Sequence, residues 1–286
     1  MPRLIVNADD FGLTSGVNRA ILELHSAGVL TSTSLMASAG ATAEAIEIAR
    51  ATPTLGVGCH VVLVDGEPIL SARQQISHLA DAGRDRLRSS LWSFLRGLDL
   101  ESGRKEFRRQ IEAETRAQIE SLQNKGVHLT HIDTHKHTHM FPSVLRPVLR
   151  AARACGIRVI RNPFEPHWAV RSARRAPWIR LAEVSALRWL APICNRIIAE
   201  EGFTTTDGTI AVAATGVLDA SNLRSLVASL PRGTWELVTH PGYNDDDLAR
   251  VRTRLRASRD IEREALAALK GFSAIELISF GQLNHS

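Results

Sequence analysis

Short β-rich runs alternate with helical stretches along most of the chain. These runs cover Leu4–Ala8, Thr31–Ala37, Val57–Leu63, His128–Asp133, Ile157–Arg161, Ile210–Ala214, Glu236–Thr239 and Ile275–Phe280. Helical patterns between them include Val17–Ala27, Ala41–Ala51 and Glu106–Lys125. Such alternation predicts a mostly parallel sheet. We expect an α/β fold, a (β/α) barrel of seven to eight strands, with a doubly wound open sheet as the alternative.

Length and charge narrow the class further. The chain has 286 residues, of which 44% are hydrophobic. We expect one domain over 1–286, with inserts near 65–103 and 164–203 that interrupt the pattern. The net charge is +5, and seven arginines lie between Arg158 and Arg188. This excess indicates an anionic partner, either a phosphate-bearing substrate or a membrane surface. No nucleic-acid motif is found, so we expect no nucleic-acid partner.

The cysteines and the N-terminal sequence bear on location. Cys59, Cys155 and Cys194 form no CxxC pair, which fits a reducing compartment. The first residues lack the apolar run of a signal peptide, and no stretch of eighteen apolar residues occurs. We expect a cytoplasmic protein, and attachment to the inner face of the membrane remains open. The sequence makes no prediction of oligomeric state.

Five of the eleven histidines fall within residues 128–139. Four of them share odd numbering with Asp133, and on an extended strand these five side chains would line one face: His131, Asp133, His135, His137 and His139. Imidazole and carboxylate together are ligands for a divalent metal ion. The strand would span roughly 26 Å from first to last, so one ion cannot bind them all. Other ligands must come from elsewhere in the chain.

Further polar side chains occur in or directly after the expected strands. Asn7-Ala-Asp-Asp-Phe-Gly12 ends the first, His60 lies within the third, and His240 ends the seventh in Thr-His-Pro-Gly-Tyr. The carboxyl ends of barrel strands meet at one mouth, so residues 9, 10, 60, 135 and 240 should converge. Each has a plainer alternative: a helix cap for the acidic pair, a core histidine for His60, a solvated loop for the histidine stretch, and a turn for His240.

The second insert is rich in tryptophan and arginine. Trp168, Trp178 and Trp189 interleave with a set of basic residues: Arg171, Arg174, Arg175, Arg180 and Arg188. One interpretation is an ordinary helical insert whose arginines extend to solvent. The other is a surface that contacts anionic lipid, with tryptophan at headgroup depth.

Four motifs in order resemble the YdjC-like family of carbohydrate deacetylases. They are Asn7-Ala-Asp-Asp-Phe-Gly12, Gly58-Cys-His60, His131-Ile-Asp-Thr-His-Lys-His-Thr-His139 with Met-Phe-Pro142, and His240-Pro-Gly-Tyr243. Val62-Leu63-Val64-Asp65-Gly66 and the long insert after it are similar to the hopanoid-biosynthesis-associated (HpnK-like) subgroup. The resemblance implies a barrel-like fold and metal-dependent removal of an N-acetyl group from an amino sugar, here lipid-linked as an acetylglucosaminyl hopanoid.

The resemblance also implies roles for individual residues. Asp10, His60 and His135 would hold one divalent ion, Zn or Mg first, with Ni or Co as alternatives. Asp9 would be the general base and His240 a proton donor or orienting residue. The remaining candidates would contact substrate or support the ligands: Asn7, His131, Asp133, His137 and His139.

Other functions stay open at this point. A chitooligosaccharide deacetylase would use the same residues on a soluble substrate. Clustered histidines and aspartates on a barrel also suit a two-metal phosphoesterase. A non-catalytic metal- or lipid-binding protein is the third alternative.

Overall fold

The computed structural model describes residues 1–71, 74–81, 85–96, 104–173, 176, 178–269 and 274–285. Seven strands occur in these ranges: β1 (Arg3–Phe11), β2 (Ser32–Leu35), β3 (Gly56–Val61), β4 (Leu129–Thr134), β5 (Gly208–Ile210), β6 (Thr234–Thr239) and β7 (Glu276–Leu277). The helices that connect or follow them are α1 (Ser15–Ser26), α2 (Thr42–Ala51), α3 (Leu91–Arg96), α4 (Arg104–Gln123), η1 (His135–Met140), α5 (Pro142–Ala154), α6 (His167–Ser172), α7 (Trp178–Leu187), η2 (Arg188–Leu190), α8 (Ala191–Glu200), α9 (Ala220–Ala228), α10 (Asp246–Arg250), α11 (Ser258–Ala267) and η3 (Phe280–His285).

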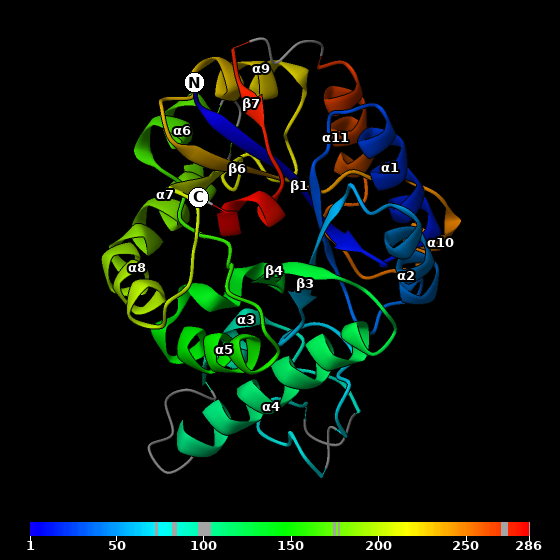
Figure 1. Ribbon diagram of the computed structural model, residues 1–286, viewed down its shortest axis with the longest axis vertical. Coiled ribbons are helices and arrows are strands. Elements are labelled where there is room, and N and C mark those ends of the chain that lie inside the picture. The colour runs from blue at the N-terminus through cyan, green and yellow to red at the C-terminus, as the bar shows by residue number, and fades with distance from the viewer. Residues whose placement is uncertain are drawn as a thin grey trace.

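The strands form one parallel, curled sheet in the order β4-β3-β2-β1-β6-β5, and β7 pairs with the start of β1. Figure 1 shows α1, α2 and α11 together on one side, α7 and α8 on the other, and α4 and α5 below β3 and β4. This arrangement confirms the expected α/β, barrel-like fold. It also brings the carboxyl ends of β1, β3, β4 and β6 to a common edge.

One predicted strand is not a regular strand. Residues 157–161 pair only through isolated bridges, from Ile160 to Ile132 of β4 and from Val159 to Thr204. Hydrogen bonds from Ile132 N to Val159 O and from Ile160 N to Thr204 O accompany them. The segment therefore continues the curl of the sheet beyond β4 without extended ladder pairing.

Side-chain alternation on β1 separates two environments. Leu4, Val6 and Ala8 join the main apolar core, which includes the inner faces of the helices. Ile5 points the other way and packs in a smaller cluster with residues of the C-terminal segment and of residues 157–161: Val159, Ile278, Phe280 and Leu283. The C-terminal segment thus closes the amino-terminal end of the curled sheet with apolar side chains.

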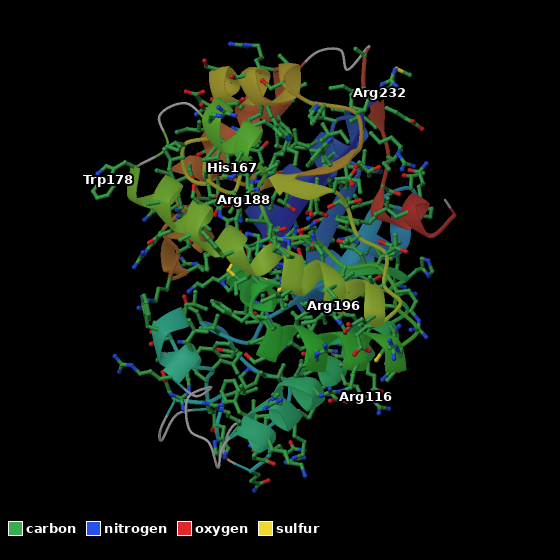
Figure 2. The ribbon with its side chains drawn as sticks, turned by 90° about the vertical axis from the view of Figure 1, so that its left-hand side faces the viewer. Arg116, His167, Trp178, Arg188, Arg196 and Arg232 are labelled. Carbon is green, nitrogen blue, oxygen red and sulfur yellow. The ribbon has the colours of Figure 1, made fainter. Side chains whose placement is uncertain are left out.

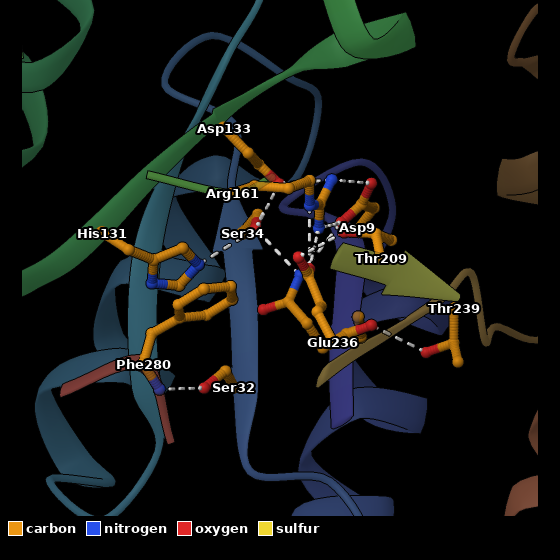
Figure 3. A network of polar contacts seen from close by, with 12 residues as sticks. Asp9, Ser32, Ser34, His131, Asp133, Arg161, Thr209, Glu236, Thr239 and Phe280 are labelled. Atoms are coloured by element: carbon orange, nitrogen blue, oxygen red, sulfur yellow. Dashed lines mark hydrogen bonds and ion pairs between the residues drawn. The ribbon is translucent and has the colours of Figure 1, made fainter. Parts of the chain in front are cut away.

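Beyond this apolar cluster, toward the carboxyl ends of the strands, the inner face of the curled sheet is polar. It holds fully buried residues of several strands and of the segment 157–161: Asn7, Ser34, His131, Asp133, Arg161, Thr209 and Glu236. Figure 3 shows several of these side chains gathered around the guanidinium of Arg161. Buried polar groups on this scale need mutual hydrogen bonds, so the interior of the sheet is where a functional network is expected.

Candidate active site

A bulge at the end of β1 directs two adjacent aspartates into one site. The pairing of β1 with β2 shifts register between Ala8 and Phe11, and Asp10 has φ of 64°. Strict alternation would send Asp10 to the outer face with Ala8. The left-handed residue instead turns its side chain toward β3, while Asp9 stays inside the curl. The two aspartates therefore have different partners.

Asp10 meets two imidazoles from other strand ends. Its Oδ1 lies 3.6 Å from Nε2 of His60 and 3.5 Å from Nδ1 of His135, and the two histidine nitrogens are 3.3 Å apart. One ligand atom from each of these three residues lies within 4.8 Å of the other two. A carboxylate oxygen and two imidazole nitrogens converging in this way fit the donor set of a borderline divalent cation.

Asp133 orients His60 from behind. Its Oδ1 lies 2.8 Å from Nδ1 of His60, and this bond leaves Nε2 facing Asp10 and His135. Burial acts to lower the pKa of His60, but the charges of Asp133, Asp9 and Asp10 prevail and raise it to about 9. The ring therefore sits in a field that favours positive charge at Nε2, either as a proton or as a metal ion.

Arg161 binds three buried carboxylates. Its Nη1 and Nη2 donate to Oδ2 and Oδ1 of Asp9 at 2.8 and 2.6 Å. It also lies 2.6 Å from Oδ2 of Asp133 and donates through Nε to Glu236 at 2.8 Å (Figure 3). Although burial works in the opposite direction, this guanidinium keeps the pKa of Asp9 below its usual value. Burial nevertheless raises the pKa of Glu236 to about 7.

Asn7, which was predicted to contact substrate or to support the ligands, lies beside Asp9. Its side-chain amide donates to Oδ1 of Asp9 and to Ser34 Oγ, both at 3.0 Å. Asp9 is thus fixed by the amide on one oxygen and by the arginine on both.

His240 reaches the same edge from the end of β6. Its Nε2 lies 3.8 Å from Oδ2 of Asp9, and its Nδ1 lies 3.9 Å from Oε2 of Glu262 on α11. The backbone N–H of His240 donates to that same Glu262 oxygen at 2.6 Å. The imidazole is therefore held between a buried acid and the carboxylate of Asp9. The five residues expected to converge, at 9, 10, 60, 135 and 240, do so.

The histidine stretch does not continue as a strand, and the prediction of five groups on one strand face was wrong. β4 ends at Thr134, and η1 follows with left-handed backbone at Lys136 (φ 55°) and His137 (φ 51°). The turn brings His135 back over the strand ends. Of the five alternating residues, only His131 and Asp133 therefore lie on one strand face.

The other cluster histidines lie away from the three-residue group. His131 is fully buried and stacks on Phe280 with ring centroids 3.9 Å apart; burial lowers its pKa to about 3. His139 bonds Thr134 Oγ1 at 2.7 Å and the Arg161 carbonyl at 3.2 Å, and burial lowers its pKa to about 4. Burial also depresses the pKa of His137. His131 and His139 are thus buried and held in the neutral form, whereas His137 is half-buried.

Sequence reasoning missed three charged residues. Arg161 was counted in the basic surface excess, yet it is fully buried. Arg259 and Glu262 lie on α11, close to the C-terminus in sequence, and each contacts a predicted site residue. The available signal was weak: Arg161 is the last residue of a predicted strand run, and the two α11 residues are three apart on one helix face.

The tryptophan- and arginine-rich insert contacts the last residue of η1. Arg188 Nη1 donates to the Glu165 carbonyl, and Cys194 Sγ contacts the carbonyl of Met140 at the end of η1. Trp178 and Trp189 are 76% and 85% exposed, whereas Trp168 packs edge-on against Trp235. Figure 2 shows Trp178 projecting on the opposite side of the view from Arg232, which precedes β6. The predicted Arg174 and Arg175 lie outside the described residues.

None of the helices in the described ranges is long and apolar enough to cross a lipid bilayer.

Comparison with known proteins places the chain. A carbohydrate deacetylase of Thermoanaerobacter pseudethanolicus is 29% identical over 93% of this chain and 91% of its own length. One of Oceanobacillus iheyensis is 36% identical over 86% and 88%. A crystal structure from Enterococcus faecalis V583, of a protein whose name suggests cleavage of cellobiose phosphate, superposes with a TM-score of 0.72 at 25% identity, covering 99% of this chain and 98% of the other. The model of the family described as YdjC-like protein matches residues 3–273, so the chain belongs to the YdjC-like family.

Proposed function

We propose that this protein is a divalent-metal-dependent hydrolase that removes the acetyl group from an N-acetylglucosamine-type sugar. The observation that carries the proposal is the convergence of Asp10, His60 and His135, with ligand atoms within 4.8 Å of one another beside Asp9 and His240. The similarity to carbohydrate deacetylases along nearly the full chain supports the same reaction class. We also propose that residues 1–286 form one barrel domain.

A bound ion would polarise the acetyl carbonyl and water, which is the chemistry that amide hydrolysis needs near neutral pH. Zn²⁺ or Mg²⁺ suits one carboxylate and two imidazoles, and Ni²⁺ or Co²⁺ would also fit. Asp10, His60 and His135 would hold the ion, and the side chain of His135, 21% exposed, places one ligand toward solvent.

Asp9 and His240 would move the protons. Arg161 keeps Asp9 ionised, and only an ionised carboxylate can accept a proton as general base. His240 presents Nε2 to the same space while Glu262 lies behind Nδ1. In this geometry His240 can donate a proton to the departing amine, which is a poor leaving group without one.

Arg161 argues against a two-metal phosphoesterase. A second group of potential ligands exists, formed by Asp9, His60 and Asp133. Arg161 already binds both oxygens of Asp9 and one of Asp133, and a cation there would meet this buried positive charge. The site therefore favours a single ion over a pair.

We further propose that the substrate is lipid-linked, as in an acetylglucosaminyl hopanoid, and that the protein works at a membrane surface. In α7, η2 and α8, Trp178, Trp189 and Ile193 are exposed by 76, 85 and 52%. Their spacing of eleven and four residues places them near one face of a helical run. Exposed tryptophans beside basic residues suit the interface of an anionic bilayer.

Acetate release tests the activity. The protein, loaded with Zn²⁺ or Mg²⁺, should release acetate from an N-acetylglucosaminyl lipid, and a chelator should stop the release. Release from soluble chitooligosaccharides alone would support the chitooligosaccharide alternative. No release from any N-acetylated sugar, with metal bound, would reject the deacetylase proposal.

Vesicle sedimentation tests the surface separately. A Trp178→Ser/Trp189→Ser protein should lose binding to anionic vesicles and show a raised KM only for the lipid-borne substrate. Trp92→Ser is the matched control, since Trp92 on α3 is 79% exposed. Equal vesicle binding by these two variants and the unmodified protein would reject the membrane contact and leave the hydrolase proposal intact.

A further inference from the structure

The two carboxylate oxygens of Asp10 have different surroundings, because Arg259 binds one of them. The arginine lies on α11 and is fully buried, and its Nη2 donates to Oδ2 of Asp10 at 2.5 Å. The other oxygen, Oδ1, is the one that faces His60 and His135 at 3.6 and 3.5 Å. One oxygen is thus turned toward the proposed metal ligands, and the other is taken by an arginine.

The hydrogen bonds of Arg259 do not serve the fold in an obvious way. Among the described residues, its Nε and Nη1 are buried without a hydrogen-bond partner. Leaving such groups unpaired is unfavourable, and buried arginines usually satisfy several donors at once. Arg161 does so with three carboxylates. The interaction that accounts for Arg259 is therefore the one with Asp10.

The loop of His240 is built around this arginine. A Cβ atom on Gly242 would lie 3.1 Å from Cδ of Arg259, and Gly242 N donates to the Arg259 carbonyl at 3.3 Å. The glycine of the His-Pro-Gly turn thus leaves the space that Arg259 fills. Glu262, one helical turn further along α11, binds the backbone N–H of His240. A single helix face therefore contacts both Asp10 and the His240 loop.

We propose that Arg259 is a positioning residue that restricts Asp10 to binding the metal ion through one oxygen. The inference rests on the proposed metal site. An ion held by one carboxylate oxygen and two imidazoles keeps more of its coordination shell open than an ion held through both oxygens of Asp10. An open shell is what a hydrolytic site requires, because substrate and water must reach the ion.

Removal of the arginine should separate metal binding from turnover. Without Arg259, Oδ2 becomes free to join Oδ1 on the ion, and a positive charge near the ion disappears. Both changes favour tighter binding. They oppose the loss of a supporting hydrogen bond, which typically weakens metal binding by about 10–100-fold. We expect the two favourable changes to prevail, so the dissociation constant for the metal should not rise.

The test compares Arg259→Met, Arg259→Lys and Arg250→Met with the unmodified protein. Arg250 is the control for charge, since its side chain is 76% exposed on α10. Each protein is loaded with Co²⁺, whose visible absorption weakens as its coordination number rises, and calorimetry gives the dissociation constant. Kinetics on the N-acetylated sugar gives kcat and KM.

Arg259→Met should show weaker cobalt absorption, a dissociation constant equal to or below that of the unmodified protein, and kcat lower by at least about tenfold, with KM within about threefold. Arg259→Lys keeps a donor for Oδ2, so its cobalt spectrum and metal affinity should stay close to normal, with kcat reduced less than in Arg259→Met. Arg250→Met should change nothing.

Several results would overturn the inference. A folded Arg259→Met protein with an unaltered cobalt spectrum, or with metal affinity reduced more than tenfold, would mean that Arg259 does not set the ligation of Asp10. If Arg259→Met fails to fold, Arg259→Leu, which also lacks a donor for Oδ2, takes its place, and an unaltered cobalt spectrum in that variant would lead to the same conclusion. Failure of the unmodified protein to bind Co²⁺ would instead reject the metal site itself.

Discussion

Replacing Asp133 by asparagine should weaken metal binding through a residue that need not touch the metal. The carboxylate accepts from His60 Nδ1 and Ser34 Oγ, both at 2.8 Å, and lies 2.6 Å from Arg161. Asparagine has nearly the same shape but only one acceptor oxygen. It can satisfy His60 or Arg161, not both, so either the imidazole loses its orientation or an N–H group of the amide faces the guanidinium.

The size of the effect follows from these contacts. Loss of an outer hydrogen bond to a ligating histidine typically lowers metal affinity by about 10–100-fold. Loss of one charge-assisted hydrogen bond in the buried network should lower the free energy of unfolding by about 1.5–3 kcal/mol. Calorimetric titration with Zn²⁺ measures the first quantity, and urea unfolding of the metal-free protein measures the second.

Glu236→Gln is the matched control. Glu236 also binds Arg161, at 2.8 Å, and also lies fully buried on a strand of the same sheet. It contacts the arginine and Thr209 but not His60. Its substitution should lower stability and leave metal affinity within about threefold. Equal losses of metal affinity in the two variants, or none in Asp133→Asn, would refute the orienting role of Asp133.

Three further outcomes are expected. Asp9→Asn should retain bound metal in calorimetry while the rate of acetate release falls by about 10²–10⁴-fold, and a near-normal rate would remove Asp9 as the base. Glu165 accepts backbone N–H groups of residues 211 and 213, yet burial raises its pKa to about 7. A group whose pKa is raised in the folded state contributes its full stability below the unfolded value near 4.5 and loses that contribution as the pH rises through 7. Between pH 5 and pH 8, the unfolding free energy of Glu165→Gln should therefore improve relative to that of the unmodified protein, by at most about 3 kcal/mol. A difference between the two proteins that does not change with pH would contradict the raised pKa of Glu165. Phe280→Ala should lower the unfolding free energy by about 3–5 kcal/mol in urea titration, because it removes the buried ring that stacks on His131. A loss under about 1 kcal/mol would contradict the role of Phe280 in closing the amino-terminal end of the sheet.

The fold was predictable because its signals are local. Runs of strand composition alternate with helical periodicity, and seven of the eight predicted runs overlap a strand in the described residues, although Ile210–Ala214 does so only at Ile210, where β5 ends. The exception, residues 157–161, has the composition of a strand but pairs through isolated bridges. Composition indicates burial in such a segment, but tertiary contacts decide whether a regular ladder forms.

The convergence of Asp10, His60 and His135 was predictable for a related reason. Parallel strands in a curled sheet end at one edge, so polar residues at strand ends meet there whatever their separation in sequence. The path of the histidine stretch after Thr134 was not predictable, because Lys136 and His137 adopt left-handed backbone that non-glycine residues seldom show. Alternating residue types alone could not reveal that turn.

The charged residues that bind the site aspartates left only a weak signal in the sequence. Arg161 bonds Asp9 across 152 residues of sequence, and Arg259 bonds Asp10 across 249. An arginine near the surface and one buried against a carboxylate look alike in a sequence, since only the folded chain determines which charges are removed from water.

The location of the ion tests the central claim most directly. Crystals of the protein grown with Zn²⁺ would be measured by anomalous diffraction at the zinc edge. We expect one peak within coordination distance, about 2 Å, of Asp10 Oδ1, His60 Nε2 and His135 Nδ1. A peak among Asp9, His60 and Asp133, a pair of peaks, or a peak that leaves out His135 would contradict the proposed metal site.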